Sequence, residues 1–471
     1  MTAAALSTPE PLWTAQDAAE ATGGHVTRDW AATGVAIDSR HIEPGDLFVA
    51  LRGESTDGHR FIADALAKGA AAVVADHFPD NAGSGVPALM VADTQTALED
   101  LARAARARSQ ARVIAVTGSV GKTGTKNALA HVLGAQGETH AAAASHNNHW
   151  GVPLTLARLP RSAAYCVVEM GMNAPGEIAA LSRLARPHVT VITEVAAAHT
   201  AAFASVEGIA DAKAEIFQGA DPGATAVLPR DNPHVARLAE HAGAAGIERL
   251  ISFGRDAEAT IRVVEEAPDE RGTEVTAALG LRHLSFRVGI PGDHWVMNAL
   301  AVLGAVAAVD ADPGAAAASL AELEPAPGRG QRHTVAVDGG TATLIDESYN
   351  ANPTSMRAAI ALLARAEPGP GGRRIAVLGD MLELGERSAH DHGGLAEPLR
   401  AAGVDAVFTC GDQMTALRDA LPAAVHAGHA ADAETLTGQV TAALRPGDVV
   451  LVKGSAGART GAVVRALTDA G

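Results

Sequence analysis

Short apolar runs alternate with helix-like segments over most of this chain. Beyond residue 112, the runs rich in Val, Ile and Leu that predict buried strands are residues 113–116, 165–169, 189–194, 343–346, 375–378, 406–409 and 449–452. Strands separated by helical segments are typical of parallel sheets joined by crossover helices. We therefore expect an α/β fold with parallel sheets in the central and C-terminal parts of the chain.

The first hundred residues form a separate compact pattern. A buried strand over residues 47–51 follows a Pro-Gly-Asp turn, and a helix over 61–71 leads to an apolar strand at 72–75. Farther along, a stiff Pro/Gly segment at 325–330 marks a hinge. Because 471 residues exceed one ordinary core, we predict three domains, at residues 1–108, 109–326 and 327–471.

Two further elements are expected before the hinge. A sheet rich in Thr and Val over residues 274–290 follows a charged stretch. Pro291, Gly292 and Asp293 then turn the chain into an Ala-rich helix that contains Asn298. No internal repeat is visible.

The segment V-I-A-V-T-G-S-V-G-K-T-G-T, residues 113–125, carries the main chemical signal. A buried strand, a glycine turn and a helix over 125–133 predict a phosphate cradle, because glycines let backbone N–H groups approach an anion at a helix N-terminus. Lys122 would supply a charge for the phosphates and Thr123 a hydroxyl for Mg²⁺. The spacing is G-x-x-G-K-T, shorter than the common P-loop. The alternative is a tight turn with a solvated Lys122.

Acidic residues follow two of the predicted strands. Glu169 and Glu194 each end an apolar run, and His199 comes soon after. Ligands of open α/β sheets bind at the carboxyl ends of the strands. We therefore expect these side chains near Lys122 and Thr123.

Composition and charge narrow the class of protein. The formal net charge of −17 argues against a nucleic-acid or anionic-membrane partner. The N-terminus lacks the basic and apolar regions of a secretory signal, and the longest apolar run, residues 299–309, is too short to insert into a membrane. Cys166 and Cys410 make no disulfide framework. We expect a cytoplasmic protein, monomeric by default because no exposed apolar helix face stands out.

Further motifs combine with the phosphate loop into a recognisable order. They are S-H-N-N-H-W-G-V-P from residue 145, V-V-E-M-G-M from 167, A-H-T-A-A-F-A-S from 198, A-D-A-K-A-E-I-F from 210, L-I-D-E-S-Y-N-A-N-P from 344 and L-G-D-M-L-E-L-G-E-R-S-A-H from 378. This set resembles the Mur ligases, the ATP-dependent amide-forming enzymes of peptidoglycan precursor synthesis, over essentially the whole chain. The two C-terminal motifs resemble the branch that adds D-alanyl-D-alanine to UDP-N-acetylmuramoyl-tripeptide.

The resemblance implies a role for each domain and two cofactors, ATP and Mg²⁺. The N-terminal domain would bind the UDP-sugar nucleotide, the central P-loop domain ATP, and the C-terminal Rossmann-like domain would close to bring the dipeptide amine to an acyl phosphate. The implied ATP-binding residues are Gly118, Ser119, Val120, Gly121, Lys122, Thr123, Gly124, Asn298, Arg329, Asp346, Tyr349 and Asn350.

The resemblance also assigns catalytic, metal and substrate residues. Lys122, His199 and Lys213 would be catalytic, with Lys213 resembling a lysine that relatives carbamylate. The implied metal ligands are Thr123, Glu169, His199 and, as a carbamate, Lys213. The implied substrate-binding residues are Ser39, Arg40, Asn147, Asn148, Asp380, Glu383 and His390.

Structural interpretations remain open for several of these residues. Without the resemblance, Asp38, Ser39 and Arg40 are read as a capped turn, and a lone His such as His199 as a structural or surface residue. Lys213 could be a surface lysine near Asp211 or Glu215. Asn298 could be a tolerated polar residue on its helix, and the loop with Asp380, Glu383 and His390 could simply be capped.

The chain departs from the usual pattern of the family at several positions, which are Ser145, His149, Trp150, Glu194, Trp295 and Glu347. The segment 452–460 also keeps the K-G-S start of its motif but not the usual Met-Glu ending. These departures concern contacts to adenine and peptide rather than the type of reaction. The competing hypotheses are another Mur ligase, a folylpolyglutamate-type ligase, or a P-loop ATPase that uses ATP to switch conformation.

Overall fold

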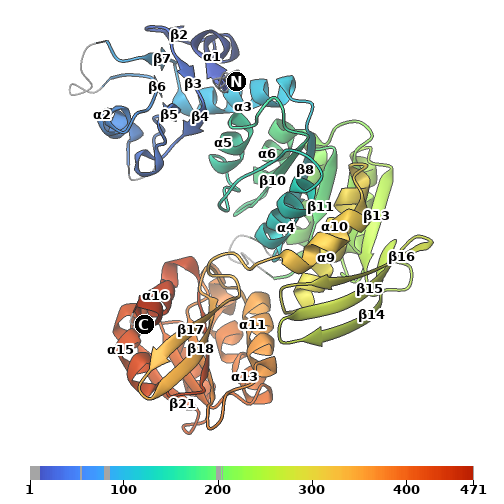
Figure 1. Cartoon of the computed structure of the whole chain (residues 1–471), viewed down its shortest axis with the longest axis vertical. Helices are drawn as coiled ribbons and strands as arrows, with labels where there is room; N and C mark the ends of the chain where they lie inside the picture. The colour runs from blue at the N-terminus through green and yellow to red at the C-terminus, as the bar shows by residue number, and fades with distance from the viewer. Residues whose placement is uncertain (1–10, 54–55, 79–84, 198–202, 204, 470–471) are drawn as a thin grey trace, which may run out of the picture.

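The structure is a computed structural model that describes residues 11–53, 56–78, 85–197, 203 and 205–469. Three α/β domains follow one another along the chain, each built around its own main sheet (Figure 1). The N-terminal and C-terminal domains lie at opposite ends of the molecule in this view, with the central domain between them. The predicted fold class is therefore confirmed.

The N-terminal domain contains a five-stranded sheet in the order β2-β7-β6-β5-β4. Its strands are β2 (His25–Val26), β4 (Gly34–Ala36), β5 (Asp46–Val49), β6 (Ala72–Ala75) and β7 (Ala88–Met90). Strands β4 to β7 are parallel and β2 is antiparallel. The remaining elements are a ribbon of β1 (Trp13–Thr14) and β3 (Ala31–Ala32), and helices α1 (Ala15–Thr22), α2 (Ile62–Ala67) and α3 (Thr94–Arg108).

The strands predicted at 47–51 and 72–75 are confirmed as β5 and β6. The helix predicted over 61–71 is shorter, because a 3₁₀ turn, Gly58–Phe61, precedes α2 and the helix ends at Ala67. Gly69 adopts φ +98°, a left-handed conformation that breaks a helix and that glycine reaches at little cost. The chain turns there into β6.

The central sheet has nine strands in the order β16-β15-β14-β13-β12-β11-β8-β10-β9. Its parallel strands are β8 (Arg112–Thr117), β9 (Thr139–Ala141), β10 (Tyr165–Glu169), β11 (Val189–Ile192), β12 (Thr225–Pro229) and β13 (Arg249–Gly254). The strands β14 (Ile261–Asp269), β15 (Gly272–Leu279) and β16 (Arg282–Val288) form an antiparallel meander at one end, with β14 parallel to β13. The Thr- and Val-rich segment thus extends the central sheet rather than forming its own.

Helices cover both faces of this sheet. On one side pack α4 (Lys122–Gly134), α9 (Asp293–Ala308) and α10 (Pro313–Ser319). The other side carries α5 (Gly151–Ala157), α6 (Glu177–Ala185), α7 (Val206–Ala214) and α8 (Val235–Ala244). Alternate residues of β8 enter the two cores, Ile114 and Val116 one, Val113 and Ala115 the other. Burial on both faces explains the continuous apolar run of this strand.

The C-terminal sheet has the order β17-β18-β22-β19-β20-β21. Its strands are β17 (Gln331–Val337), β18 (Gly340–Glu347), β19 (Arg374–Gly379), β20 (Ala406–Cys410), β21 (His426–Ala430) and β22 (Val449–Lys453). All neighbours are parallel except β17 and β18. The helices are α11 (Pro353–Arg365), α12 (Ser388–Gly393), α13 (Ala396–Ala401), α14 (Thr415–Ala420), α15 (Ala433–Ala443) and α16 (Gly461–Asp469).

The two domain junctions differ in character. The N-terminal domain is joined to the central one by buried hydrogen bonds, in which Trp13 Nε1 donates to the Ala157 carbonyl at 2.9 Å and Arg106 Nε donates to the Ala185 carbonyl at 2.8 Å. The central and C-terminal domains share an exposed ion pair between Asp293 and Arg365 at 2.9 Å. Exposed ion pairs contribute little stability.

Across the described residues, none of the helices combines the length and the apolar character that a bilayer crossing requires.

Candidate active site

The phosphate loop lies between β8 and α4, as the sequence predicts, and is tied to the segment after β11. The Ser119 hydroxyl donates to the Ala196 carbonyl at 2.9 Å, and the Ser119 amide donates to the Glu194 carbonyl at 2.8 Å. Thr193 Oγ1 donates to the Val120 carbonyl at 2.6 Å. These bonds fix the loop to the segment that follows β11.

Two glycines of the loop have no room for a side chain. A Cβ on Gly118 would lie 1.9 Å from Thr193 Oγ1, and a Cβ on Gly121 would lie 2.6 Å from Asn298 Oδ1. Both have positive φ, and Gly121 caps the N-terminus of α4. Helix α4 therefore begins at Lys122, three residues before the predicted start. Its free N–H groups face the turn, which suits an anion.

Lys122 is turned back onto the loop, with Nζ donating to the Gly118 carbonyl at 2.7 Å. Burial lowers the pKa of its ammonium group, the nearby Glu169 opposes this shift, and Arg329 adds to it. The alternative of a solvated Lys122 does not describe this side chain. An anion bound in the loop would raise this pKa again by direct attraction.

Glu169 lies beside the loop at the carboxyl end of β10, which is hydrogen-bonded to β8. Its side chain is 2% exposed, and Oε1 accepts a hydrogen bond from Asn147 Nδ2 at 2.8 Å. Oε2 is buried and has no hydrogen-bond partner among the described residues. Buried carboxylate oxygens are normally paired, so this one points to a missing ligand.

Thr123 and the segment 142–145 face each other across the loop. Thr123 Oγ1 lies 3.0 Å from Ser145 Oγ, which also accepts from Arg329 at 3.4 Å. The sequence reasoning missed Lys126, a fully buried lysine whose Nζ donates to the Ala142 and Ala144 carbonyls. Its signal was its position one helical turn after Lys122. Asn148 caps α5 by accepting from the amides of Trp150 and Gly151.

Lys213 is buried, with 2% exposure, so the surface interpretation is wrong. Burial lowers the pKa of its amine well below the usual value, and the nearby charge of Lys122 lowers it further. Asp211 instead pairs with Arg237 and His241, and Glu215 accepts from the Gly176 and Ala179 amides. His199, the companion prediction, lies outside the described residues.

Helix α9, the Pro/Gly segment 325–330 and the loop after β18 come together at the hinge. Asn298 of α9 is 6% exposed and lies against Gly121. The Arg329 guanidinium lies over the Tyr349 ring at 4.0 Å, and 42% of Tyr349 is exposed. The structure therefore brings Asn298 and Arg329 to the phosphate loop. Asp346 and Asn350 flank Tyr349 and accept hydrogen bonds from nearby amides, those of Ser348 and Ala351.

Ser39 and Arg40 belong to the N-terminal domain, where they lie in the 3₁₀ turn Ser39–His41 that follows β4. Asp38 accepts from the Arg40 amide at 3.0 Å and pairs with its guanidinium at 2.6 Å. Ser39 is 6% exposed, and its carbonyl accepts from Lys68. The Arg40 hydrogen bond holds the pKa of Asp38 down to about 2. This is the capped turn that the residues alone predict.

Asp380, Glu383 and His390 belong to the loop after β19 and to α12. Asp380 accepts from the Met414 amide at 2.9 Å and the Gln413 amide at 3.3 Å, so it does cap a turn. Glu383 and His390 are exposed. Sequence reasoning missed the fully buried His392, which bonds to this loop.

Three of the departures from the family pattern can be placed in the structure. Trp295 is 8% exposed, and its ring would lie 2.9 Å from a Cβ on Gly124, so Gly124 makes room for it. Burial raises the pKa of Glu194, although a hydrogen bond from Asn232 opposes the shift. Trp150 packs against the core of the N-terminal domain and lies 3.1 Å from the Cβ position of Gly53.

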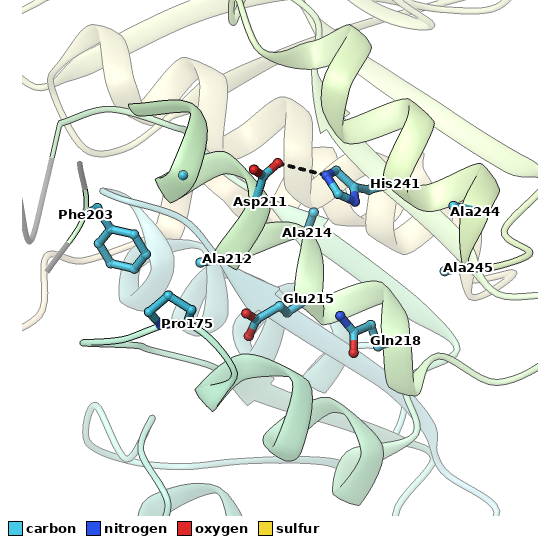
Figure 2. A pocket seen from close by; sticks show the side chains of 11 residues that line it. Pro175, Phe203, Asp211, Ala212, Ala214, Glu215, Gln218, His241, Ala244 and Ala245 are labelled. Atoms are coloured by element: carbon cyan, nitrogen blue, oxygen red, sulfur yellow. Dashed lines mark hydrogen bonds and ion pairs between the residues drawn. The ribbon is translucent and has the colours of Figure 1, made fainter. Parts of the chain in front are cut away.

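A cavity of about 540 Å³ lies beside α7, and the described residues that line it include none of the predicted site residues. Figure 2 shows Asp211 bonded to His241 at its wall, with Glu215 and Gln218 below. These groups link neighbouring helices. This cavity is therefore separate from the group of residues at the carboxyl ends of β8 and β10.

The fold and the site define a three-domain α/β protein with a phosphate-binding loop, an unpaired carboxylate beside it and a buried lysine. Family models match this chain over three segments: the Mur ligase family catalytic domain at residues 31–106, the Mur ligase middle domain at 116–306, and the Mur ligase glutamate ligase domain at 328–456. The chain belongs to the Mur ligase family.

Individual relatives extend this similarity over nearly the whole chain. The UDP-N-acetylmuramoyl-tripeptide--D-alanyl-D-alanine ligase of Escherichia coli strain K12 is 36% identical over 96% of each chain. A crystal structure of MurF from Acinetobacter baumannii is 29% identical, with a TM-score of 0.83, over 98% of this chain and 99% of that one. A MurF ligase structure from Thermotoga maritima in complex with ADP is 27% identical, with a TM-score of 0.75, over 93% and 97%.

Proposed function

We propose that this chain joins D-alanyl-D-alanine to UDP-N-acetylmuramoyl-tripeptide in an ATP-dependent reaction. The products are the UDP-N-acetylmuramoyl-pentapeptide precursor of peptidoglycan, ADP and phosphate. The observation that carries the proposal is the 36% identity, over 96% of the chain, to the Escherichia coli ligase of that name. The phosphate loop and its neighbouring groups support the nucleotide-dependent part.

The reaction has two steps. The tripeptide carboxylate attacks the γ-phosphate of ATP, so that ADP leaves and an acyl phosphate forms. The dipeptide amine then attacks the acyl carbon, and phosphate leaves as the amide bond forms. Phosphoryl transfer depends mainly on positioning and charge neutralisation. The N-terminus of α4 and the Lys122 ammonium group supply both, in a cradle that Gly118 and Gly121 keep open.

The residues beside the loop fit Mg²⁺. The unpaired Oε2 of Glu169 and the hydroxyl of Thr123 are oxygen donors, which this hard cation prefers. When bound, the ion would neutralise charge on the ATP phosphates. His199 as a further ligand stays a prediction.

Lys213 fits the carbamate role that the family resemblance implies. Burial lowers the pKa of its amine well below the usual value, which favours the uncharged form that can react with CO₂. The carbamate would place a negative charge in the neighbourhood of Lys122. Buried lysines in general have lowered pKa values and are used for such chemistry.

The substrates are assigned to the outer domains. Ser39 and Arg40 would contact the UDP end, Asn147 and Asn148 the muramyl peptide, and Asp380, Glu383 and His390 the dipeptide. We place the domain boundaries at residues 108/109 and 326/327, which fall between the segments matched by the family models. Closure of the C-terminal domain would exclude water from the acyl phosphate. We place the reaction in the cytoplasm and take the protein to be a monomer without a nucleic-acid or membrane partner.

The experiment measures ADP release with Mg²⁺-ATP and UDP-N-acetylmuramoyl-tripeptide, with and without D-alanyl-D-alanine, and follows the product by mass. ADP release that depends on the dipeptide, with a product heavier by one dipeptide residue, supports the proposal. Activity with another amine only would identify a different amide ligase. ATP hydrolysis that needs neither substrate would favour a switch ATPase.

A further inference from the structure

The buried side chain of His392 has a defined protonation state. Its Nδ1 lies 2.7 Å from the Ser388 carbonyl oxygen, which can only accept, so Nδ1 carries the proton. Its Nε2 lies 2.9 Å from the Met381 amide nitrogen, which can only donate, so Nε2 accepts. The imidazole is therefore neutral, and each of its nitrogens has a partner of the right kind. His392 is fully buried.

The Met381 amide belongs to the loop over residues 380–384, between β19 and the 3₁₀ turn Gly385–Arg387. The next amide, that of Leu382, donates to Ser455 Oγ at 2.9 Å, and Ser455 Oγ donates to the Ala351 carbonyl. His392 and Ser455 thus hold adjacent amides of the loop from two sides. The following residue, Glu383, has φ +64°, a conformation that is costly for a residue with a Cβ. Such a conformation persists only where neighbouring contacts fix it.

A second set of contacts joins His392 to Asp380. Ser388 Oγ lies 3.2 Å from His392 Nδ1 and donates to Gln413 Oε1 at 2.7 Å. The Gln413 amide in turn donates to Asp380 Oδ2 at 3.3 Å. Asp380, Met381, His392, Ser388 and Gln413 therefore form a closed ring of contacts. Loss of the imidazole would open this ring at the loop.

We propose that His392 is a positioning residue that holds the 380–384 loop in the geometry that receives the amine substrate. This inference rests on the proposed function, which assigns Asp380 and Glu383 of the same loop to the dipeptide. The positioning role is assigned to His392, which is buried, and not to His390, which is exposed on the same helix. His392 itself touches the loop backbone and acts through it.

The test compares two variants of the full-length enzyme. His392→Leu fills the space but removes the acceptor for the Met381 amide, whereas the Oε1 of His392→Gln can still accept. An unpaired buried amide costs enough to shift binding by about tenfold or more. We expect His392→Leu to raise the KM for D-alanyl-D-alanine by about tenfold, to leave the KM for ATP within twofold of wild type, and to be largely rescued by His392→Gln. The matched control is His283→Leu, an exposed histidine on β16.

A measurement on the wild-type enzyme covers the case in which the leucine variant fails to fold. Nitrogen-15 NMR of labelled histidines, assigned with His392→Gln, should show for His392 an imidazole protonated at Nδ1 with an unprotonated Nε2. An Nε2-protonated or charged ring would overturn the inference. So would an unchanged KM for the dipeptide in a folded leucine variant of an active ligase. A wild-type enzyme that does not use D-alanyl-D-alanine would instead refute the proposed function. The NMR measurement would still determine the tautomer of His392 in that case.

Discussion

The Arg329 guanidinium lies 4.0 Å above the ring of Tyr349 and at the same time reaches Ser145 Oγ at 3.4 Å. One side chain at the hinge therefore contacts a loop of the C-terminal domain and the segment that faces Thr123. A stacked arginine of this kind is held by the face of the ring and not by the hydroxyl.

Removal of the Tyr349 ring should weaken nucleotide use. Since cation–π contacts contribute about 0.5–1 kcal/mol at exposed sites, Tyr349→Leu should raise the KM for ATP by roughly two- to fivefold. Tyr349→Phe keeps the ring and should stay within twofold of wild type. Steady-state kinetics with varied ATP measures both. An equal rise of the KM for ATP in the two variants would mean that the hydroxyl of Tyr349, and not the stacking of its ring, contributes to nucleotide use.

Gly118 should tolerate no side chain. Gly118→Ala places a Cβ 1.9 Å from Thr193 Oγ1, so either the loop or the segment that follows β11 must shift. Misplaced phosphate-binding groups lose positioning, and we expect kcat to fall by at least about a hundredfold. Gly134→Ala is the matched control, because it lies at the end of the same helix with no heavy atom within 4 Å of the added Cβ. It should keep full activity and gain up to about 1 kcal/mol of stability.

Glu169→Gln should separate metal binding from folding. The amide oxygen can still accept from Asn147 Nδ2, but the charge that would face Mg²⁺ is gone. We expect a thermal midpoint close to that of wild type and a rise in the Mg²⁺ concentration needed for half-maximal ADP release of about tenfold, since carboxylate ligands set the affinity for hard cations. A variant with unchanged Mg²⁺ dependence would show that another residue holds the ion.

His188, which directly precedes β11, should make the free energy of unfolding depend on pH. Burial, helped by Arg106 and Arg112, lowers its pKa from 6.5 to about 4, although Asp221 opposes the shift. Between these values the unfolded chain binds a proton that the folded chain does not, so the free energy of unfolding falls as the pH drops from 6.5 to 4. The loss amounts to at most about 3 kcal/mol.

The variant His188→Asn tests this prediction. Nδ1 of His188 accepts from the Val113 amide at 2.8 Å, and an asparagine oxygen can take over that bond. Thermal midpoints of wild type and variant should therefore diverge below pH 6.5, with the variant losing less stability. Parallel curves down to pH 4 would refute the assignment.

The sequence was sufficient to predict structure where the local hydrophobic pattern and the chemical motif lie in the same segment. The apolar run of β8, the glycines and Lys122 predict the phosphate loop, because a doubly buried strand, a left-handed turn and a helix start each leave a local signal. The strand β14 was missed, since most of its side chains are exposed and no alternation of buried and exposed positions marks it. Its pairing with β15 comes from tertiary context and not from its own residues.

Burial of single polar residues was the harder part. Lys213 could be placed on a surface by its neighbours Asp211 and Glu215, yet those carboxylates bond elsewhere and the lysine faces the core. His390 and His392 are two residues apart, and only the packing of α12 against α14 decides which of them is buried. The residues around the two histidines do not show which face of α12 will be buried.

The central claim is tested most directly by an oxygen-18 label in the terminal carboxylate of the UDP-N-acetylmuramoyl-tripeptide. If the carboxylate attacks the γ-phosphate and the dipeptide amine then displaces phosphate, one labelled oxygen must leave in the phosphate for each amide bond formed. The expected result is singly labelled phosphate in a one-to-one ratio with the pentapeptide product, only when D-alanyl-D-alanine is present. Unlabelled phosphate accompanying product formation would contradict the acyl-phosphate route, and phosphate released without the dipeptide would contradict the assigned reaction.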